Sequence, residues 1–379
     1  MSLVWQSEEK KTPGTHVMIV GVGSYPYFPG HTVENPVGQV EMTARSAFAL
    51  AQWFVKSHSN ETTPLRSVRL LLSGDETRAK AQEYFGCPIQ TATFANLEAA
   101  FWEWQNALKA DDGSVAVFYF AGHGIGNAFA QGLFLEDYNQ NVNRPLSGAV
   151  NYNNLRQSIT QHATIDSAWF FIDACRVADL DQVARTIWGM DLDQNVSLLA
   201  GPVRTFQLYA AGDGQEALGV LEKTTFFGDA LIDALDKNGY YYTGNEWAIQ
   251  PSTLHSAVDV NLKWACEKAL IPESRIPQVE VRTPAGNLEL HHRGEANPPS
   301  FLVKMTCRPV EHNAQYEFSY GIKGDANRTS RDAEDAPWYC HLAPGNYSFA
   351  AQSVVGGELR QKEQYVQQHL VNVILKGTV

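Results

Sequence analysis

The chain has 379 residues, 44% of them hydrophobic, and a chain of this length and composition can bury the cores of two domains. Its formal net charge is −12 and no block of lysine or arginine stands out, which excludes nucleic acid and an anionic membrane surface as main partners. No stretch reaches the ~20 apolar residues of a membrane span and the first residues are polar, so we expect a cytoplasmic protein.

Between residues 14 and 283, short apolar runs alternate with helical patterns. The runs predict buried strands at His16–Gly23, Val68–Leu72, Val115–Phe120, Ala168–Ile172 and Thr205–Ala210. Apolar residues at helical spacing predict helices at Glu41–Lys56, Ala95–Lys109, Tyr152–Thr160, Phe227–Leu235 and Ser252–Ala269. This alternation predicts an α/β fold, with a parallel-rich sheet sandwiched by helices.

The composition changes near residue 283. Residues 284–299 are rich in proline, glycine and charge, which is typical of a linker. Beyond them, apolar and polar residues alternate in four segments: Phe301–Cys307, Gln315–Gly321, Tyr347–Gln352 and Leu370–Leu375. We therefore expect three parts, namely an α/β domain at 14–283, a linker at 284–299 and a small β-sandwich of immunoglobulin-like or transthyretin-like type at 300–379.

The five cysteines are scattered and none belongs to a CxxC pair, which indicates reduced thiols rather than a zinc site or a disulfide scaffold. A disulfide between Cys307 and Cys340 is expected only if the protein is exported. We expect no metal ion and no cofactor.

Two of the predicted strands are each followed by a reactive side chain. His123 follows the run that ends at Phe120, and Cys175 follows the run that ends at Ile172. Because chemistry in open α/β sheets collects at the carboxyl ends of strands, the two residues are predicted to share one crevice. A thiol is a good nucleophile only as the thiolate, and histidine is a suitable base near neutral pH.

The residues around this pair fit the same chemistry. Glycine on each side of His123 lets backbone amides approach a bound carbonyl, so the amides of Gly124 and Cys175 are candidate oxyanion donors. Asp173 precedes the thiol by two residues, which on a strand places both side chains on one face. Taken singly, such a cysteine is usually a small buried hydrophobe and such a histidine is usually structural.

The segments Phe118–Gly124 and Phe170–Arg176 resemble the catalytic-histidine and catalytic-cysteine segments of the caspase-like cysteine peptidases. The order, with histidine first, and the separation of 52 residues also match that family. The resemblance covers roughly residues 14–283. It implies a caspase-like fold in which His123 and Cys175 form the catalytic dyad.

The resemblance also carries expectations about the substrate. Animal caspases have Gln-Ala-Cys-Arg-Gly at the cysteine, with the glutamine in a pocket that prefers aspartate, whereas metacaspases have Asp-x-Cys, with an aspartate that selects arginine or lysine. Asp173 follows the metacaspase pattern and Arg176 follows the caspase pattern. Asp213 and Glu41 are further candidates for the pocket that binds the residue before the cleaved bond (P1). The Ca²⁺ activation of some metacaspases is not carried over, because no matching ligand cluster is recognised.

We therefore expect a bacterial cysteine endopeptidase that cleaves protein or peptide substrates after arginine or lysine. Two alternatives stay open. One is a caspase-like pseudoenzyme whose C-terminal β-domain binds a partner, and the other is a cysteine transferase or acyl-group hydrolase on the same α/β frame.

Processing is a further expectation. Family members are often cut in the segment after the cysteine, and here residues 177–204 are polar and irregular. Arg185 and Arg204 are the candidate basic sites in what is predicted to be an exposed loop.

Overall fold

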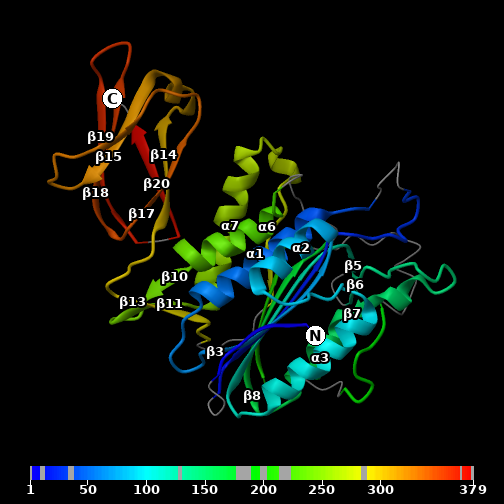
Figure 1. Ribbon diagram of the computed structural model, residues 1–379. Coiled ribbons are helices and arrows are strands. Elements are labelled where there is room, and N and C mark those ends of the chain that lie inside the picture. Colours follow the sequence, from blue (N-terminus) through cyan, green and yellow to red (C-terminus); the bar gives the residue numbers. More distant parts are fainter. Residues whose placement is uncertain are drawn as a thin grey trace. The chain divides into compact units, whose positions relative to one another are not determined.

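The chain folds into two compact units in the computed structural model (Figure 1). The first comprises Met1–Ile232 and Asn261–His291, and the second comprises Asp233–Val260 and His292–Val379. The structure describes residues 2–8, 13–32, 38–126, 130–175, 189–196, 203–212, 223–282, 288–367 and 369–376.

The first unit is built on a seven-stranded sheet. Its strands, in spatial order, are β1 (Leu3–Gln6), β3 (Leu65–Ser73), β2 (Thr15–Val22), β4 (Ser114–Ala121), β8 (Ile165–Asp173), β9 (Arg204–Tyr209) and β12 (Glu280–Arg282). The five inner strands run parallel, while β1 and β12 are antiparallel to their neighbours at the two edges. Every residue of β2, β3 and β4 is buried, as expected of strands that are covered on both faces.

Helices cover both faces of this sheet, which confirms the predicted α/β class (Figure 1). The helices that the structure describes are α1 (Glu41–Ser57), α2 (Asp75–Phe85), α3 (Phe94–Lys109), α4 (Tyr152–Thr160), α6 (Phe226–Asp233), continued by the π-helical turn η2 (Ala234–Asn238), and α7 (Pro251–Lys268). Short 3-10 turns lie at η1 (Pro145–Gly148), η3 (Glu273–Arg275) and η4 (Val310–Gln315). On the α1 face, Gly21 of β2 is close to Ala47, and a Cβ at Gly21 would lie 2.5 Å from the Ala47 Cβ.

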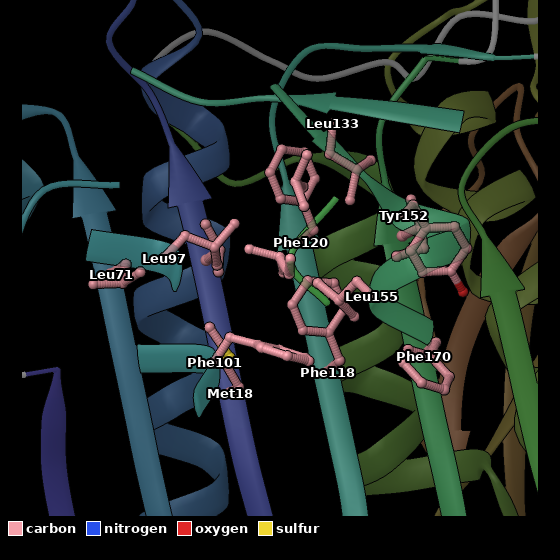
Figure 2. Packing of buried hydrophobic residues seen from close by; sticks show 14 of the residues in the cluster. Met18, Leu71, Leu97, Phe101, Phe118, Phe120, Leu133, Tyr152, Leu155 and Phe170 are labelled. Carbon is pink, nitrogen blue, oxygen red and sulfur yellow. The ribbon is translucent and has the colours of Figure 1, made fainter. Parts of the chain in front are cut away.

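The opposite face of the sheet meets α3 and α4 in one large apolar cluster (Figure 2). Alternate residues of the central strands enter it, including Phe118 and Phe120 of β4 and Phe170 of β8. The stripe predicted on α3 faces the same cluster, with Phe101 and Trp104 fully buried. These aromatic residues are part of the core.

A smaller antiparallel sheet lies beside the carboxyl end of β4. It consists of β5 (Gly124–Gly126), β6 (Gln131–Phe134) and β7 (Ala149–Asn151), in that order. Because β5 begins at the residue after His123, this sheet fixes the path of the chain as it leaves the candidate histidine.

The second unit contains three sheets. The first has the order β10 (Tyr240–Tyr242), β11 (Glu246–Ile249), β13 (His291–Gly294), and the second has the order β17 (Trp338–Leu342), β14 (Phe301–Arg308), β20 (Leu370–Lys376). The third has the order β16 (Thr329–Arg331), β15 (Tyr316–Ile322), β18 (Gly345–Ser353), β19 (Leu359–Val366). Tyr320 of the third sheet contacts Trp338 of the second, with ring centroids 5.1 Å apart. The C-terminal region is therefore rich in strands, as predicted.

The compact units differ from the predicted domain boundaries. Residues 233–260 belong to the second unit, because β10 and β11 form a sheet with β13. That third strand lies inside the range predicted as a linker, where Leu288 and Leu290 are also buried.

Candidate active site

The register of the central sheet places the two candidate catalytic segments next to each other. Ala121, the last residue of β4, pairs with Asp173, the last residue of β8. The amide of Gly122 donates a hydrogen bond of 3.2 Å to the Asp173 carbonyl, so the neighbouring strands stay in contact as they end. His123 and Cys175 each follow by two residues, so equivalent positions of adjacent parallel strands carry the imidazole and the thiol.

His123 is held by groups from the segment that follows β2. Its Nε2 lies 2.8 Å from the carbonyl oxygen of Gly38, and its backbone amide donates a 2.7 Å hydrogen bond to the Tyr25 hydroxyl. The imidazole also contacts the rings of Tyr25 and Phe28, with centroid distances of 4.8 and 5.1 Å, and these two rings contact each other at 6.1 Å. These contacts fix both the backbone and the ring of the histidine.

The partner of Nε2 determines which tautomer of His123 is present. A carbonyl oxygen only accepts hydrogen bonds, so Nε2 carries the proton when the ring is neutral and Nδ1 has the free lone pair. Burial lowers the pKa of His123, and the Gly38 carbonyl opposes this by stabilising the protonated ring. The neutral form, which can accept a proton at Nδ1, is therefore favoured near pH 7.

Gly124 is the first residue of β5 and lies against the cysteine segment. A Cβ at this position would lie 3.0 Å from the Ala174 Cβ and 3.1 Å from the Cys175 carbonyl oxygen. A side chain here would therefore crowd the residues that carry the thiol, which would have to shift by a few tenths of an ångström.

The backbone amide of Gly124 is directed away from β6. Residues facing each other across an antiparallel pair alternate between hydrogen-bonded and non-hydrogen-bonded pairs. The amide of Phe134 donates to the His123 carbonyl at 2.9 Å, so the next pair, Gly124 with Leu133, is non-hydrogen-bonded. The pairing of β6 with β7 agrees with this register. The amide of Leu135 donates to the Gly148 carbonyl, so Leu133, two residues earlier, also bonds to β7 and not to β5.

Cys175 forms no disulfide bond and is partly exposed. Burial raises the pKa of Tyr25, the hydrogen bond from the His123 amide lowers it, and the charge of a Cys175 thiolate raises it. Cys307 and Cys340 also form no disulfide bond, and burial raises the pKa of the Cys340 thiol to about 12. Buried thiols of this kind are poor nucleophiles at neutral pH.

Asp173 lies in a buried polar cluster. It is 1% exposed, and its Oδ2 accepts hydrogen bonds from the hydroxyls of Tyr119, at 3.0 Å, and Thr225. The Thr225 hydroxyl also lies 3.0 Å from that of Ser46 on α1. Oδ1 has no hydrogen-bond partner among the described residues.

This environment changes the titration of Asp173. Burial raises the pKa of the carboxyl from 3.8 to about 6, and the hydrogen bonds from Thr225 and Tyr119 only partly oppose it. The carboxyl lacks a charged partner that would stabilise its ionised form within the described part of the chain.

The other predicted pocket residues have different settings. Glu41 begins α1 and binds the start of α2, where its Oε1 accepts a 2.5 Å hydrogen bond from the Thr77 hydroxyl. Asp213, like Arg176 and Arg185, lies outside the described residues.

The expectation that Arg204 lies in an exposed loop is wrong. It is the first residue of β9 and pairs with Asp166 of β8, with Nη2 and Oδ1 2.6 Å apart. The sequence analysis ended the loop one residue too late because it began the strand at Thr205.

No group of three or more histidine, cysteine or acidic side chains is placed to hold a metal ion within the described ranges. Of the helices that the structure describes, none is both long and apolar enough to cross a membrane.

Sequence analysis missed the groups that hold His123. Tyr25 follows a strand and precedes a proline, which gives no hint of a buried hydroxyl. The Gly38 carbonyl has no sequence signature, since every residue has a carbonyl group. The glycine itself is explained by its φ of +78° and by the Phe28 ring, whose Cγ would lie 2.5 Å from an added Cβ.

The histidine and cysteine segments thus lie at the ends of adjacent strands in a parallel-rich α/β sheet with helices on both faces. Residues 78–287 match the family model of the caspase domain, Peptidase_C14. The match spans more than half of the chain, so the chain belongs to the caspase family, and the predicted fold class is confirmed.

Two further similarities are weaker. The chain is 29% identical over 144 residues to the uncharacterized protein y4kE of Sinorhizobium fredii (strain NBRC 101917 / NGR234), covering 34% of this chain and 40% of that protein. The chain thus spans less than half of that relative's length. It is also similar to the crystal structure of caspase-1 from Spodoptera frugiperda, with 12% identity, a TM-score of 0.42, and coverage of 73% of this chain and 89% of that chain.

Proposed function

We propose that this protein is a cysteine endopeptidase in which His123 and Cys175 act as the catalytic dyad. The observation that supports this most is the register of β4 and β8, which places the two segments at equivalent positions of adjacent strands in a chain of the caspase family. The tautomer that Gly38 imposes on His123 is a second support, because it leaves Nδ1 ready to accept a proton.

The reaction follows from these groups. The Cys175 sulfur attacks the scissile carbonyl carbon, and the thiol proton passes to Nδ1 of His123. The amides of Gly124 and Cys175 stabilise the oxyanion, and the free direction of the Gly124 amide supports this role. Cleavage of the C–N bond transfers the proton to the leaving amine, and a water molecule, deprotonated by the same histidine, then hydrolyses the thioester.

The proposed substrates are proteins or peptides with arginine or lysine at P1. The buried carboxyl of Asp173 has one unpartnered oxygen in the described part of the chain and a raised pKa, so a cationic guest would stabilise its ionised form. A guanidinium suits this role best because it donates two parallel hydrogen bonds to a carboxylate. A hydrogen bond to a charged group contributes about 1.5–3 kcal/mol, which is a selectivity of roughly 10- to 100-fold.

The test compares otherwise identical fluorogenic peptides with Arg, Lys, Asp or Leu at P1. We expect Arg to be cleaved at least as well as Lys, with Asp and Leu nearly inert. Asp173→Ala should lose this preference more than it loses the reactivity of Cys175 toward a small alkylating agent. A preference for Asp at P1 would show that other residues form the pocket.

A further inference from the structure

The hydroxyl of Tyr25 is inserted between the histidine segment and β6. It accepts a 2.7 Å hydrogen bond from the His123 amide and donates a 3.1 Å hydrogen bond to the Phe134 carbonyl. His123 and Phe134 face each other in the antiparallel register that pairs β5 with β6. In a regular ladder these two backbone groups would bond to each other.

Only half of that backbone pair is present. The amide of Phe134 donates directly to the His123 carbonyl at 2.9 Å, as the ladder requires. The reciprocal bond, from the His123 amide to the Phe134 carbonyl, is replaced by two hydrogen bonds through the Tyr25 hydroxyl. The two strands are therefore further apart at the His123 amide than in a regular ladder. A single N–H···O=C bond of about 2.9 Å would draw this amide toward Phe134. The hydroxyl therefore sets the distance of the His123 backbone from β6.

The phenol is well suited to a fixed position. Tyr25 is fully buried, and its ring contacts the His123 imidazole. Burial raises the pKa of its hydroxyl, so the group stays protonated and can donate and accept at once. A Cβ on Gly122 would lie 2.5 Å from this oxygen, so the glycine before His123 is required to admit it.

We propose that Tyr25 is a positioning residue, whose hydroxyl sets the backbone of His123 at the distance from β6 that the reaction needs. The proposal rests on the proposed role of His123 as general base. Three groups of one segment then hold different parts of the histidine. The Tyr25 hydroxyl holds the backbone, the Gly38 carbonyl holds Nε2, and the Phe28 ring packs against the imidazole.

The test replaces Tyr25 by phenylalanine, which keeps the ring and removes only the oxygen. The His123 amide and the Phe134 carbonyl then either lose their partner or bond directly, and both outcomes displace the base. Because a displacement of about 1 Å can lower a rate 100-fold, we expect Tyr25→Phe to lower kcat by about 10- to 100-fold, with KM changed by less than about threefold.

A matched control is Tyr152→Phe. Tyr152 is equally buried in the same apolar cluster, and its hydroxyl donates a 3.0 Å hydrogen bond to Gln207. This variant loses one buried hydroxyl whose partner is Gln207 of β9 and none of the groups that hold His123, so it should lower the melting temperature while kcat stays within about twofold of the wild type.

A second readout does not need peptide cleavage. The rate of Cys175 alkylation by iodoacetamide is followed by peptide mass spectrometry from pH 5 to 9. Its pH profile should shift in Tyr25→Phe and not in Tyr152→Phe, because the thiol senses the position of the imidazole. If the wild type cleaved no peptide but the profile still shifted, the proposed function would fail and the positioning role would stand.

The proposal is overturned if Tyr25→Phe leaves both kcat and the alkylation profile within about twofold of the wild type. If that variant does not fold, hydrogen exchange of the His123 amide in the wild type decides. A phenol-bonded amide should exchange slowly, and rapid exchange would show that the bridge is absent in solution.

Discussion

The buried carboxyl of Asp173 leads to a prediction about stability. Replacing Asp173 by asparagine keeps the shape of the side chain but removes the ionisable group. A carboxyl with a raised pKa binds its proton more tightly in the folded chain than in the unfolded chain. The stabilisation of the folded state by this tighter proton binding is therefore fully present below pH 3.8, and it is lost as the pH rises through about 6.

The magnitude follows from the two pKa values. The pKa of Asp173 changes from 3.8 to about 6 on folding, and each pKa unit corresponds to about 1.4 kcal/mol. At pH 8 the ionised carboxyl therefore lowers the free energy of unfolding by roughly 3 kcal/mol. Asp173→Asn should therefore be more stable than the wild type at pH 8, by up to that amount. Between pH 8 and pH 5 this advantage should shrink by about 1–2 kcal/mol.

Chemical denaturation of both proteins from pH 5 to 8 measures this difference. Thr225→Val provides a second comparison. The Thr225 hydroxyl lowers the pKa of Asp173, so without it the free energy of unfolding should continue to depend on pH above pH 6. A difference between Asp173→Asn and the wild type that does not vary with pH would refute the reasoning. It would mean that the carboxyl is not desolvated in the folded protein.

Three further outcomes concern the reaction. Cys175→Ala should abolish peptide cleavage with the fold intact, and His123→Ala should lower activity about as much, because the two residues act as one unit. Substantial activity in either variant would contradict the dyad. Gly124→Ala keeps the backbone amide but crowds the cysteine segment, so the small displacement of this oxyanion donor should lower kcat by about 10-fold. An unchanged kcat would show that the position of this amide does not limit the reaction. If the enzyme processes itself after Arg185, incubation of active protein should give fragments split there while Arg185→Gln and Cys175→Ala stay whole; a fully active protein that is never cut would show that processing is not needed.

The five central strands of the first sheet and most helices were predictable because apolar runs and helical stripes leave few alternatives. For example, Glu41–Lys56 was predicted and α1 runs from Glu41 to Ser57. By contrast, α2 was missed, since only Thr77 and Ala81 of its eleven residues are buried and no apolar stripe marks it. The edge strands β1 and β12 were missed because three or four residues are too short to show a period.

The site was predictable to the level of residue type and order. The sequence places histidine, cysteine and aspartate at strand ends, but burial depends on what the rest of the chain brings to those ends. Asp173 is covered by hydroxyls of Tyr119 and Thr225, which come from other elements of the fold. Likewise, the contacts that hold His123 come from a segment about 90 residues earlier, and nothing in the sequence next to the histidine predicts them.

The central claim is that Cys175 is a peptidase nucleophile served by His123 in a pocket for basic residues. Labelling with two peptidyl electrophiles that differ only at P1, arginine in one and aspartate in the other, tests it most directly. Intact-mass and peptide mass spectrometry should find one adduct, on Cys175, formed faster with the arginine probe and lost in His123→Ala. Adducts on another cysteine, no adduct, or equal labelling of the wild type and His123→Ala would contradict the account.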